Sequence, residues 1–172
     1  MSDAFCEIAF TPSVLQAQQH YNGRSAVQPA NVEPARLNPE EIAFIRERDS
    51  FYMATVSETG WPYIQHRGGP RGFLRVLDDQ TLAFADFRGN RQLLTVGNLA
   101  VNDRVALFLM DYNRRERLKI LGHAKVEDAR SNENLAQSLA MPGYPAKIER
   151  AFIIRVVATE WNCPQHINPR EG

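Results

Sequence analysis

Short apolar segments separated by turn-forming residues make up most of the chain after residue 50. Four of them follow one another closely, at residues 51–56, 62–67, 73–77 and 81–87. β-Branched and aromatic residues are frequent in these segments, which is typical of strands. Glycine, aspartate and serine occupy the intervals, so we expect tight turns and an antiparallel meander.

Three later segments extend this pattern. Residues 105–110 and 151–158 are almost wholly apolar. They therefore predict strands buried on both faces, by the core on one side and by a helix or a second subunit on the other. Residues 118–126 alternate between apolar and polar, so one face of that strand should be exposed. Residues 160–172 show no periodicity and predict an irregular tail.

Helices are predicted at intervals between the strands. Asn38 can cap one helix, Pro39 suits its first position and Glu41 completes a capping box. Asn90 is a candidate cap for a second helix, and Ser131 for a short third one.

The first 36 residues are less regular. Thr11 followed by Pro12 predicts a short helix, and residues 23–37 lack periodicity and should form an extended arm. We therefore divide the chain into an N-terminal helix and arm at residues 1–36 and a folded domain at residues 37–172. Whether the arm packs on its own subunit or on a partner stays open at this point.

The order of the elements favours a mainly β fold with peripheral α-helices. About six strands are expected, with helices inserted between hairpins instead of after every strand. That order argues against a doubly wound parallel sheet and favours a six-stranded antiparallel β-barrel.

The composition of the chain argues against several classes of function. Lys and Arg number 20, Asp and Glu also number 20, and the formal net charge is zero. This balance weighs against nucleic-acid and membrane-surface binding, which need a positive excess. No apolar run approaches the ~20 residues of a membrane span, and the first ten residues do not resemble a signal peptide. Two widely separated cysteines, Cys6 and Cys163, fit a reduced, cytoplasmic protein.

The first candidate site lies between a predicted strand and a predicted helix, at residues 86–92. Gly89 permits a tight backbone approach, and a helix beginning at Asn90 would present unpaired N–H groups. Arg88 and Arg91 add charged donors, so the segment predicts an anion site with phosphate as its guest. The alternative is a capped helix whose arginines face solvent.

The second candidate lies at the end of a strand. Gln65, His66 and Arg67 precede the pair Gly68-Gly69, which would let a flat ligand approach the backbone. The alternative is a wide turn with a surface histidine. Near the C-terminus, Cys163 and His166 have the spacing of two metal ligands, but they lack a second pair, and we predict no metal site.

Several motifs in order resemble the pyridoxamine 5'-phosphate oxidase-related flavin-binding proteins. They are residues 60–69, 84–92 and 102–108, and the ending at residues 161–167 resembles one branch of predicted flavin-binding proteins. The resemblance covers about residues 37–170. It implies a split barrel that forms a homodimer, with flavin mononucleotide (FMN) in two clefts between the subunits.

The resemblance also implies roles for individual residues. The strand ending at Gln65, His66, Arg67 and Gly68 would follow the flavin ring and ribityl chain, and Ala85 and Asp86 would lie beside that chain. Asn90, Arg91 and Gln92 would hold the phosphate. Arg117 would approach the ring, and Trp161 and Arg170 would cover its far side, from the same or the partner subunit.

This chain departs from the oxidase pattern in three places, one of which is the C-terminal substrate-binding pattern, which is not clearly reproduced. The oxidase usually has Arg-Lys where this chain has Arg91-Gln92, a loss for which Arg88 can compensate. Gly68-Gly69-Pro70 interrupts a strand that is apolar in the oxidase. We therefore expect the ring site to be kept, and pyridoxamine phosphate not to be the substrate.

Three functions remain open from the sequence. The first is an FMN-dependent oxidoreductase acting on a small-molecule substrate, in which the cofactor supplies the chemistry. The second is a non-catalytic flavin- or haem-binding module. The third is a structural dimer that has lost its ligand, which the dense polar and basic segment 88–92 argues against.

Overall fold

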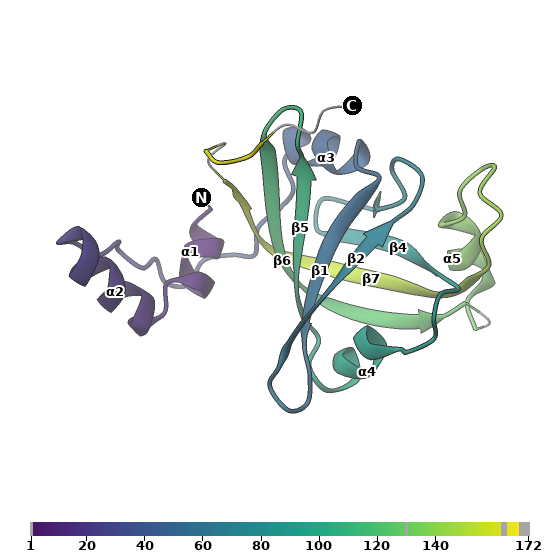
Figure 1. Ribbon diagram of the computed structural model, residues 1–172, viewed down its shortest axis with the longest axis horizontal. Coiled ribbons are helices and arrows are strands. Elements are labelled where there is room, and N and C mark those ends of the chain that lie inside the picture. The colour runs from purple at the N-terminus through teal and green to yellow at the C-terminus, as the bar shows by residue number, and fades with distance from the viewer. Residues whose placement is uncertain (1, 130, 163–164, 169–172) are drawn as a thin grey trace.

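The computed structural model describes residues 2–129, 131–162 and 165–168, and it consists of one curved antiparallel sheet with helices at its rim (Figure 1). The strands, in chain order, are β1 (Ser50–Val56), β2 (Pro62–Gly68), β3 (Arg75–Val76), β4 (Thr81–Phe87), β5 (Arg104–Asp111), β6 (Glu116–Asp128) and β7 (Ile148–Trp161). The helices are α1 (Asp3–Ala9), α2 (Pro12–Asn22), α3 (Pro39–Arg46), α4 (Leu94–Val101) and α5 (Glu133–Ser138). The predicted mainly β antiparallel fold is confirmed.

The strand count and the connection between the first two hairpins differ from the prediction. The sheet has seven strands in the order β2-β1-β5-β6-β7-β4-β3, one more than the six expected, and the predicted segment at residues 73–77 contributes only the two-residue β3. β1 pairs with β2 and β3 with β4, but β2 and β3 lie at opposite ends of this order, so the segments do not form a continuous meander. The reason lies in the connection, where Phe73 and Leu74 are buried in the core and carry the chain across the barrel.

The core fills the inside of this curved sheet. Three phenylalanines from different strands form its centre: the rings of Phe84 and Phe152 stack with centroids 4.8 Å apart, and Phe51 meets Phe84 edge-on at 5.3 Å. Leu107 of β5, Ile120 of β6 and Ile154 of β7 belong to the same hydrophobic cluster. In β1, β5 and most of β6, alternate residues form the core, as expected for a barrel closed around its own side chains.

The two strands predicted to be buried on both faces behave differently. In β5 only alternate residues such as Val105 and Leu107 are fully buried, and the residues between them are half-buried. In β7 the runs 151–152 and 158–160 are buried on both faces. The outer face of β7 is covered at one end by Leu135 of α5 and by Leu139, which follows that helix, and at the other end by Phe5 of α1.

Helix starts match the prediction only where the cap is local and complete. Asn38 accepts from the N–H of Glu41, and the Glu41 side chain accepts from the N–H of Asn38, so α3 begins with the predicted capping box. The second helix does not begin at Asn90: α4 starts four residues later, after Leu93 in a left-handed conformation. The Asn90 side chain instead accepts from the N–H of Gln92 in a local turn.

Other boundaries also shift. Asn132, not Ser131, accepts from the N–H of Leu135 before α5. β7 continues through Trp161, so the irregular tail begins later than predicted, because Glu160 and Trp161 pair with β6. The helix predicted after Thr11 is α2, whereas α1, capped by Ser2, was not predicted.

The N-terminal segment is an arm beside the barrel. Residues 24–37 form no helix or strand, as predicted, and the N–H of Ala35 donates to the carbonyl of Val157 on β7. α1 packs on β7 of its own subunit, whereas α2 has no buried residue and projects from the barrel (Figure 1). Among the described residues, no helix has the length and apolar character needed to cross a membrane.

Candidate functional site

The two free edges of the sheet meet where the barrel is split. β2 ends the sheet on one side, and the β4–β3 hairpin ends it on the other. Side chains bridge the gap: Arg67 of β2 donates to Asp86 of β4 at 3.0 Å, and Thr95 of α4 donates to Gln65 of β2 at 3.1 Å. The split is therefore lined by polar groups, unlike the rest of the barrel interior.

Asp86 joins two arginines at this split. Its second oxygen accepts from Nε of Arg150, the neighbouring residue on β7, at 2.8 Å. The side chains of Arg67 and Asp86 are 13% and 10% exposed, so their ion pair is largely shielded from water. Burial lowers the pKa of Arg67, and the charge and hydrogen bond of Asp86 oppose that shift. The carboxylate is thus the buried counter-charge that keeps both guanidinium groups in place.

The Arg67 side chain is fixed on its other side by aromatic rings. Its guanidinium carbon lies 5.0 Å from the ring centroid of Phe152 and 5.7 Å from that of Phe84. Its Nε is buried and has no hydrogen-bond partner among the described residues. A buried donor in a charged group is costly to leave unpaired, which is consistent with a ligand acceptor at this position.

A cavity of about 160 Å³ opens beside this network. Six of the residues predicted from the sequence line it together: Gln65, Arg67, Asp86, Asn90, Arg91 and Gln92. Leu94 and Thr95, at the start of α4, also line it, and α4 has no side-chain cap. Its first N–H groups are therefore available to an anion. This donor set fits the phosphate of FMN.

Arg91 connects this cavity to a larger groove. The groove has a volume of about 950 Å³ and runs between α4, β6 and the start of β7. It shares Arg91, Leu93 and Arg150 with the smaller cavity. The backbone of Arg91 is left-handed (φ 62°), as is that of Leu93 (φ 57°). The segment between β4 and α4 therefore turns sharply between the cavity and the groove.

The remaining predicted residues lie elsewhere. His66 points to the outer face of β2, where its ring meets Tyr52, and Gly68 pairs with Ser50 at the end of the strand. Ala85 packs outward in the cluster that includes Leu139. Arg88 is 54% exposed and does not line the cavity, although it lies 3.9 Å from Glu149.

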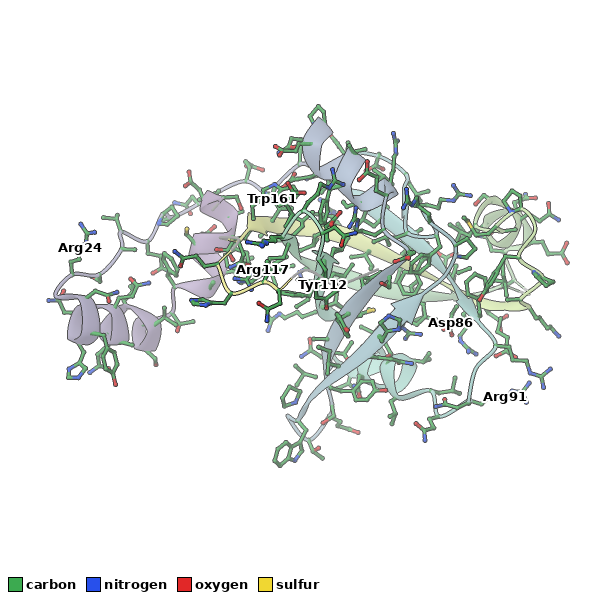
Figure 2. All side chains as sticks on the ribbon, turned by 45° about the horizontal axis from the view of Figure 1, so that its top comes forward. Arg24, Asp86, Arg91, Tyr112, Arg117 and Trp161 are labelled. Atoms are coloured by element: carbon green, nitrogen blue, oxygen red, sulfur yellow. The ribbon has the colours of Figure 1, made fainter. Side chains whose placement is uncertain are left out.

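Arg117 and Trp161 lie far from the cavity within one subunit. They occupy the start of β6 and the end of β7, and Figure 2 shows them together on the opposite side of the barrel from Asp86 and Arg91. The Trp161 ring meets Phe44 edge-on at 4.9 Å. Arg170 and Cys163 lie outside the described residues, and His166 is exposed with a left-handed backbone.

Sequence reasoning missed Arg150, Glu149, Tyr63 and Thr95. Arg150 faces Asp86 only because β7 pairs with β4 in that register, and the two residues are far apart in the chain. Tyr63 could have been found, because it shares the face of Gln65 and Arg67 through the two-residue period of a strand.

Solved structures share this fold at low sequence identity. HupZ of Group A Streptococcus is 17% identical, with a TM-score of 0.55 over 78% of this chain and 99% of that one. An F420 reductase is 19% identical, with a TM-score of 0.53 over 72% of this chain and 98% of that one. A Clostridium acetobutylicum protein of the pyridoxinephosphate oxidase family, related to general stress protein 26 of B. subtilis, is 14% identical, with a TM-score of 0.52 over 75% and 88% of the two chains.

These identities establish the fold alone, and no curated protein matches the chain. The family comes from a sequence profile described as "Pyridoxamine 5'-phosphate oxidase", which matches residues 37–162. The matched range spans all seven strands and α3 to α5, including the split and its cavity. The resemblance inferred from the motifs is therefore confirmed, and the chain belongs to the pyridoxamine 5'-phosphate oxidase family.

Proposed function

We propose that this protein binds FMN as a homodimer and is a flavin-dependent oxidoreductase acting on a small-molecule substrate in the cytoplasm. The observation that carries the proposal is the cavity at the barrel split, where Asn90, Arg91 and Gln92 meet the uncapped start of α4. These groups would hold the phosphate, while Gln65 and Arg67 would lie along the ribityl chain and the ring. When bound, the flavin supplies hydride or electron transfer.

The protein's own residues supply position and charge. Arg67 is fixed by Asp86 and by two phenylalanine rings, so its guanidinium needs little reorganisation when a ligand acceptor approaches. Asp86 also fixes Arg150, which lines the cavity. These rigidly held arginine side chains would orient the ligand, and the buried aromatic core behind them would exclude water.

A second copy of the chain is needed to complete the site. Pockets for small ligands usually enclose about 300–1,000 Å³. The cavity of about 160 Å³ accommodates only the phosphate end of the cofactor. Arg117 and Trp161, which family resemblance assigns to the ring, lie at the other end of the same barrel (Figure 2). They can reach a flavin only if it is bound by the partner subunit.

The outer face of β2, β1 and β5 is a suitable surface for that second copy. Strand register places Ile64, Ala54 and Ala106 side by side in one row, and His66, Tyr52 and Phe108 in the next. Ile64 is 64% exposed and Phe108 is only half-buried. A row of apolar side chains on an open sheet face is typical of an interface between subunits.

Absorption spectroscopy tests the cofactor. We expect flavin bands that survive desalting after incubation with FMN, and reduction of the bound flavin by a nicotinamide donor. Arg91→Ala should weaken FMN binding about tenfold or more, since a charged hydrogen bond contributes about 1.5–3 kcal/mol. Riboflavin, which lacks the phosphate, should bind equally to both proteins. Arg24→Ala, at an exposed arginine on the arm outside the cavity, is the control.

Other spectra would contradict parts of the proposal. Retention of F420 and not FMN would keep the phosphate site but change the cofactor. A Soret band would favour the haem-binding alternative. Bound flavin that no donor reduces would leave a non-catalytic flavin-binding module.

Light scattering tests the assembly. We expect a dimer at micromolar concentration, and a monomer without retained flavin for Ala54→Glu, because this change places a charge at the centre of the proposed interface. Val27→Glu introduces the same charge at a residue that is 91% exposed on the arm, and should leave the dimer intact. A wild-type monomer that binds FMN would overturn the two-subunit site.

A further inference from the structure

Glu149, at the start of β7, lies among three arginines of the candidate site. One of its oxygens lies 3.3 Å from Arg91 and 3.9 Å from Arg88, and the other lies 3.3 Å from Arg150. The Glu149 side chain is 16% exposed, whereas Arg88 and Arg91 are more than half exposed. The carboxylate is therefore more shielded from solvent than the two arginines of the β4–α4 segment, whose side chains extend back to it.

The charges of this cluster are unbalanced. Four guanidinium groups, those of Arg67, Arg88, Arg91 and Arg150, face two carboxylates, those of Asp86 and Glu149. Asp86 is fully engaged by Arg67 and Arg150. Each carboxylate therefore balances only one of the two guanidinium charges beside it, and the cluster as a whole keeps an excess of two positive charges. This excess matches the charge of about −1.5 to −2 that a phosphate monoester carries at neutral pH.

Glu149 remains ionised in this setting. Burial tends to raise the pKa of its carboxyl group, but the hydrogen bond from Arg91 and the charges of Arg91, Arg150 and Arg88 outweigh it and lower the pKa. A negative charge is thus held beside the arginines that are expected to receive the negative charge of a ligand.

We propose that Glu149 is an internal counter-anion that holds Arg88 and Arg91 in the ligand-free protein and competes with phosphate for them. This inference rests on the proposed function in assigning the phosphate to FMN. When phosphate arrives, Arg91 turns from the carboxylate toward the cavity that it also lines. Glu149 then remains paired with Arg150, so its charge is not left buried and unpaired.

This arrangement has two opposite effects on binding. The carboxylate pre-positions two exposed arginines and stabilises the empty site, but it also weakens the affinity for any anion that must displace it. The net effect of removing its charge is therefore tighter phosphate binding and a less stable ligand-free protein. A neutral ligand such as riboflavin leaves the ion pairs untouched, so its affinity should not depend on Glu149.

The test compares wild type with Glu149→Gln, which preserves shape and removes the charge. The control is Glu127→Gln on β6, whose carboxylate contacts Lys125 and Asn132 and, among the described residues, none of the four arginines of this cluster. The first probe is inorganic phosphate, and its binding is measured by thermal shift and by calorimetry. We expect Glu149→Gln to melt at a lower temperature without phosphate and to bind phosphate roughly two- to fivefold more tightly, since exposed ion pairs are weak. Glu127→Gln should match wild type.

The second probe is the ratio of FMN to riboflavin affinity, read from flavin fluorescence. It should rise by the same roughly two- to fivefold factor in Glu149→Gln and stay constant in the control. Phosphate affinity that is equal or weaker in Glu149→Gln would overturn the inference, even if FMN binds. Tighter phosphate binding without any FMN binding would support the inference and remove the proposed cofactor. Glu149→Asp, with a shorter reach to Arg91, should show an intermediate increase and covers the case in which the glutamine variant does not fold.

Discussion

Asp86 pairs with two largely shielded arginines, so replacing this one residue should strongly lower the stability of the fold. We predict that Asp86→Ala lowers the free energy of unfolding by about 3–5 kcal/mol, because it leaves the largely shielded charge of Arg67 without a counter-ion and leaves Arg150 with Glu149 alone. Urea denaturation measures this loss.

The control for Asp86 is another aspartate bound to an arginine. Asp79 pairs with Arg36 at 2.9 Å, but the two side chains are 48% and 67% exposed. Asp79→Ala should therefore cost less than about 1 kcal/mol. Equal losses in the two variants would show that the network at the barrel split is not shielded from water.

Asp111 should make stability depend on acidity. Burial tends to raise the pKa of its carboxyl group, but hydrogen bonds from the backbone and side chain of Arg114 and from Arg48 lower it from 3.8 to about 2. The folded state thus favours the charged form, and this contribution is complete above about pH 4 and is lost as the pH falls toward 2.

We predict that Asp111→Asn makes unfolding less dependent on pH between about 4 and 2. Urea denaturation at several acidic pH values measures it. The same change at the exposed Asp79 removes an equal charge and should leave the wild-type slope. An unchanged slope in Asp111→Asn would mean that the contacts with Arg48 and Arg114 do not persist in solution.

At the scale of single elements, the break in the pairing register between β6 and β7 depends on a glycine. The register between β6 and β7 shifts between Leu121 and Gly122. A Cβ on Gly122 would lie 2.5 Å from the carbonyl oxygen of Arg155. This contact is with backbone, which cannot turn away. We predict that Gly122→Ala destabilises the protein by about 1–3 kcal/mol, measured by thermal or urea unfolding.

Gly97 in α4 provides the matched substitution. It is exposed, and a Cβ there would meet nothing within 4 Å. Gly97→Ala should stabilise the helix by up to about 1 kcal/mol, since alanine favours helix more than glycine does. Equal effects at the two glycines would argue against the close approach of β6 and β7.

Elements were predictable from the sequence where their signals are local. Asn38 and Glu41 lie within one turn of each other, and their capping box fixes α3 as expected. The start of α4 was misplaced because Asn90 is equally suited to cap a helix or to stabilise a turn, and the structure adopts the turn. The end of β7 was missed because only its pairing with β6 makes residues 160 and 161 a strand.

The same distinction applies to the candidate site. Arg91, Asn90 and Gln92 could be selected from one contiguous segment, as could Gln65 and Arg67 from another. Their approach to each other, and the presence of Arg150 and Glu149, depend on the order of strands across the barrel split. No local pattern encodes that order, because β2 and β4 are not neighbours in the sheet.

At the scale of the whole molecule, the arm and the barrel form separate cores. The main hydrophobic cluster begins at Leu37, and the arm contributes Phe5 and Ala4 to a smaller cluster on β7. We predict that residues 37–172 fold cooperatively alone, with reduced stability, as measured by circular dichroism during heating. Phe5→Ala in the full chain should lower stability by about 2–4 kcal/mol. Failure of the shortened chain to fold would show that the arm belongs to the barrel core.

The length of β7 determines which residues of a flavin site must come from different subunits. Arg150 and Trp161 are eleven residues apart on this strand, about 35 Å in an extended chain, so one bound flavin cannot touch both ends of one subunit. Two defective variants should therefore complement each other. In a mixed dimer of Arg91→Ala and Trp161→Ala, one of the two sites receives an intact Arg91 from one chain and an intact Trp161 from the other. Unfolding and refolding the variants together should restore the tight flavin binding that each variant loses alone, whereas sites contained within single chains would show no such recovery.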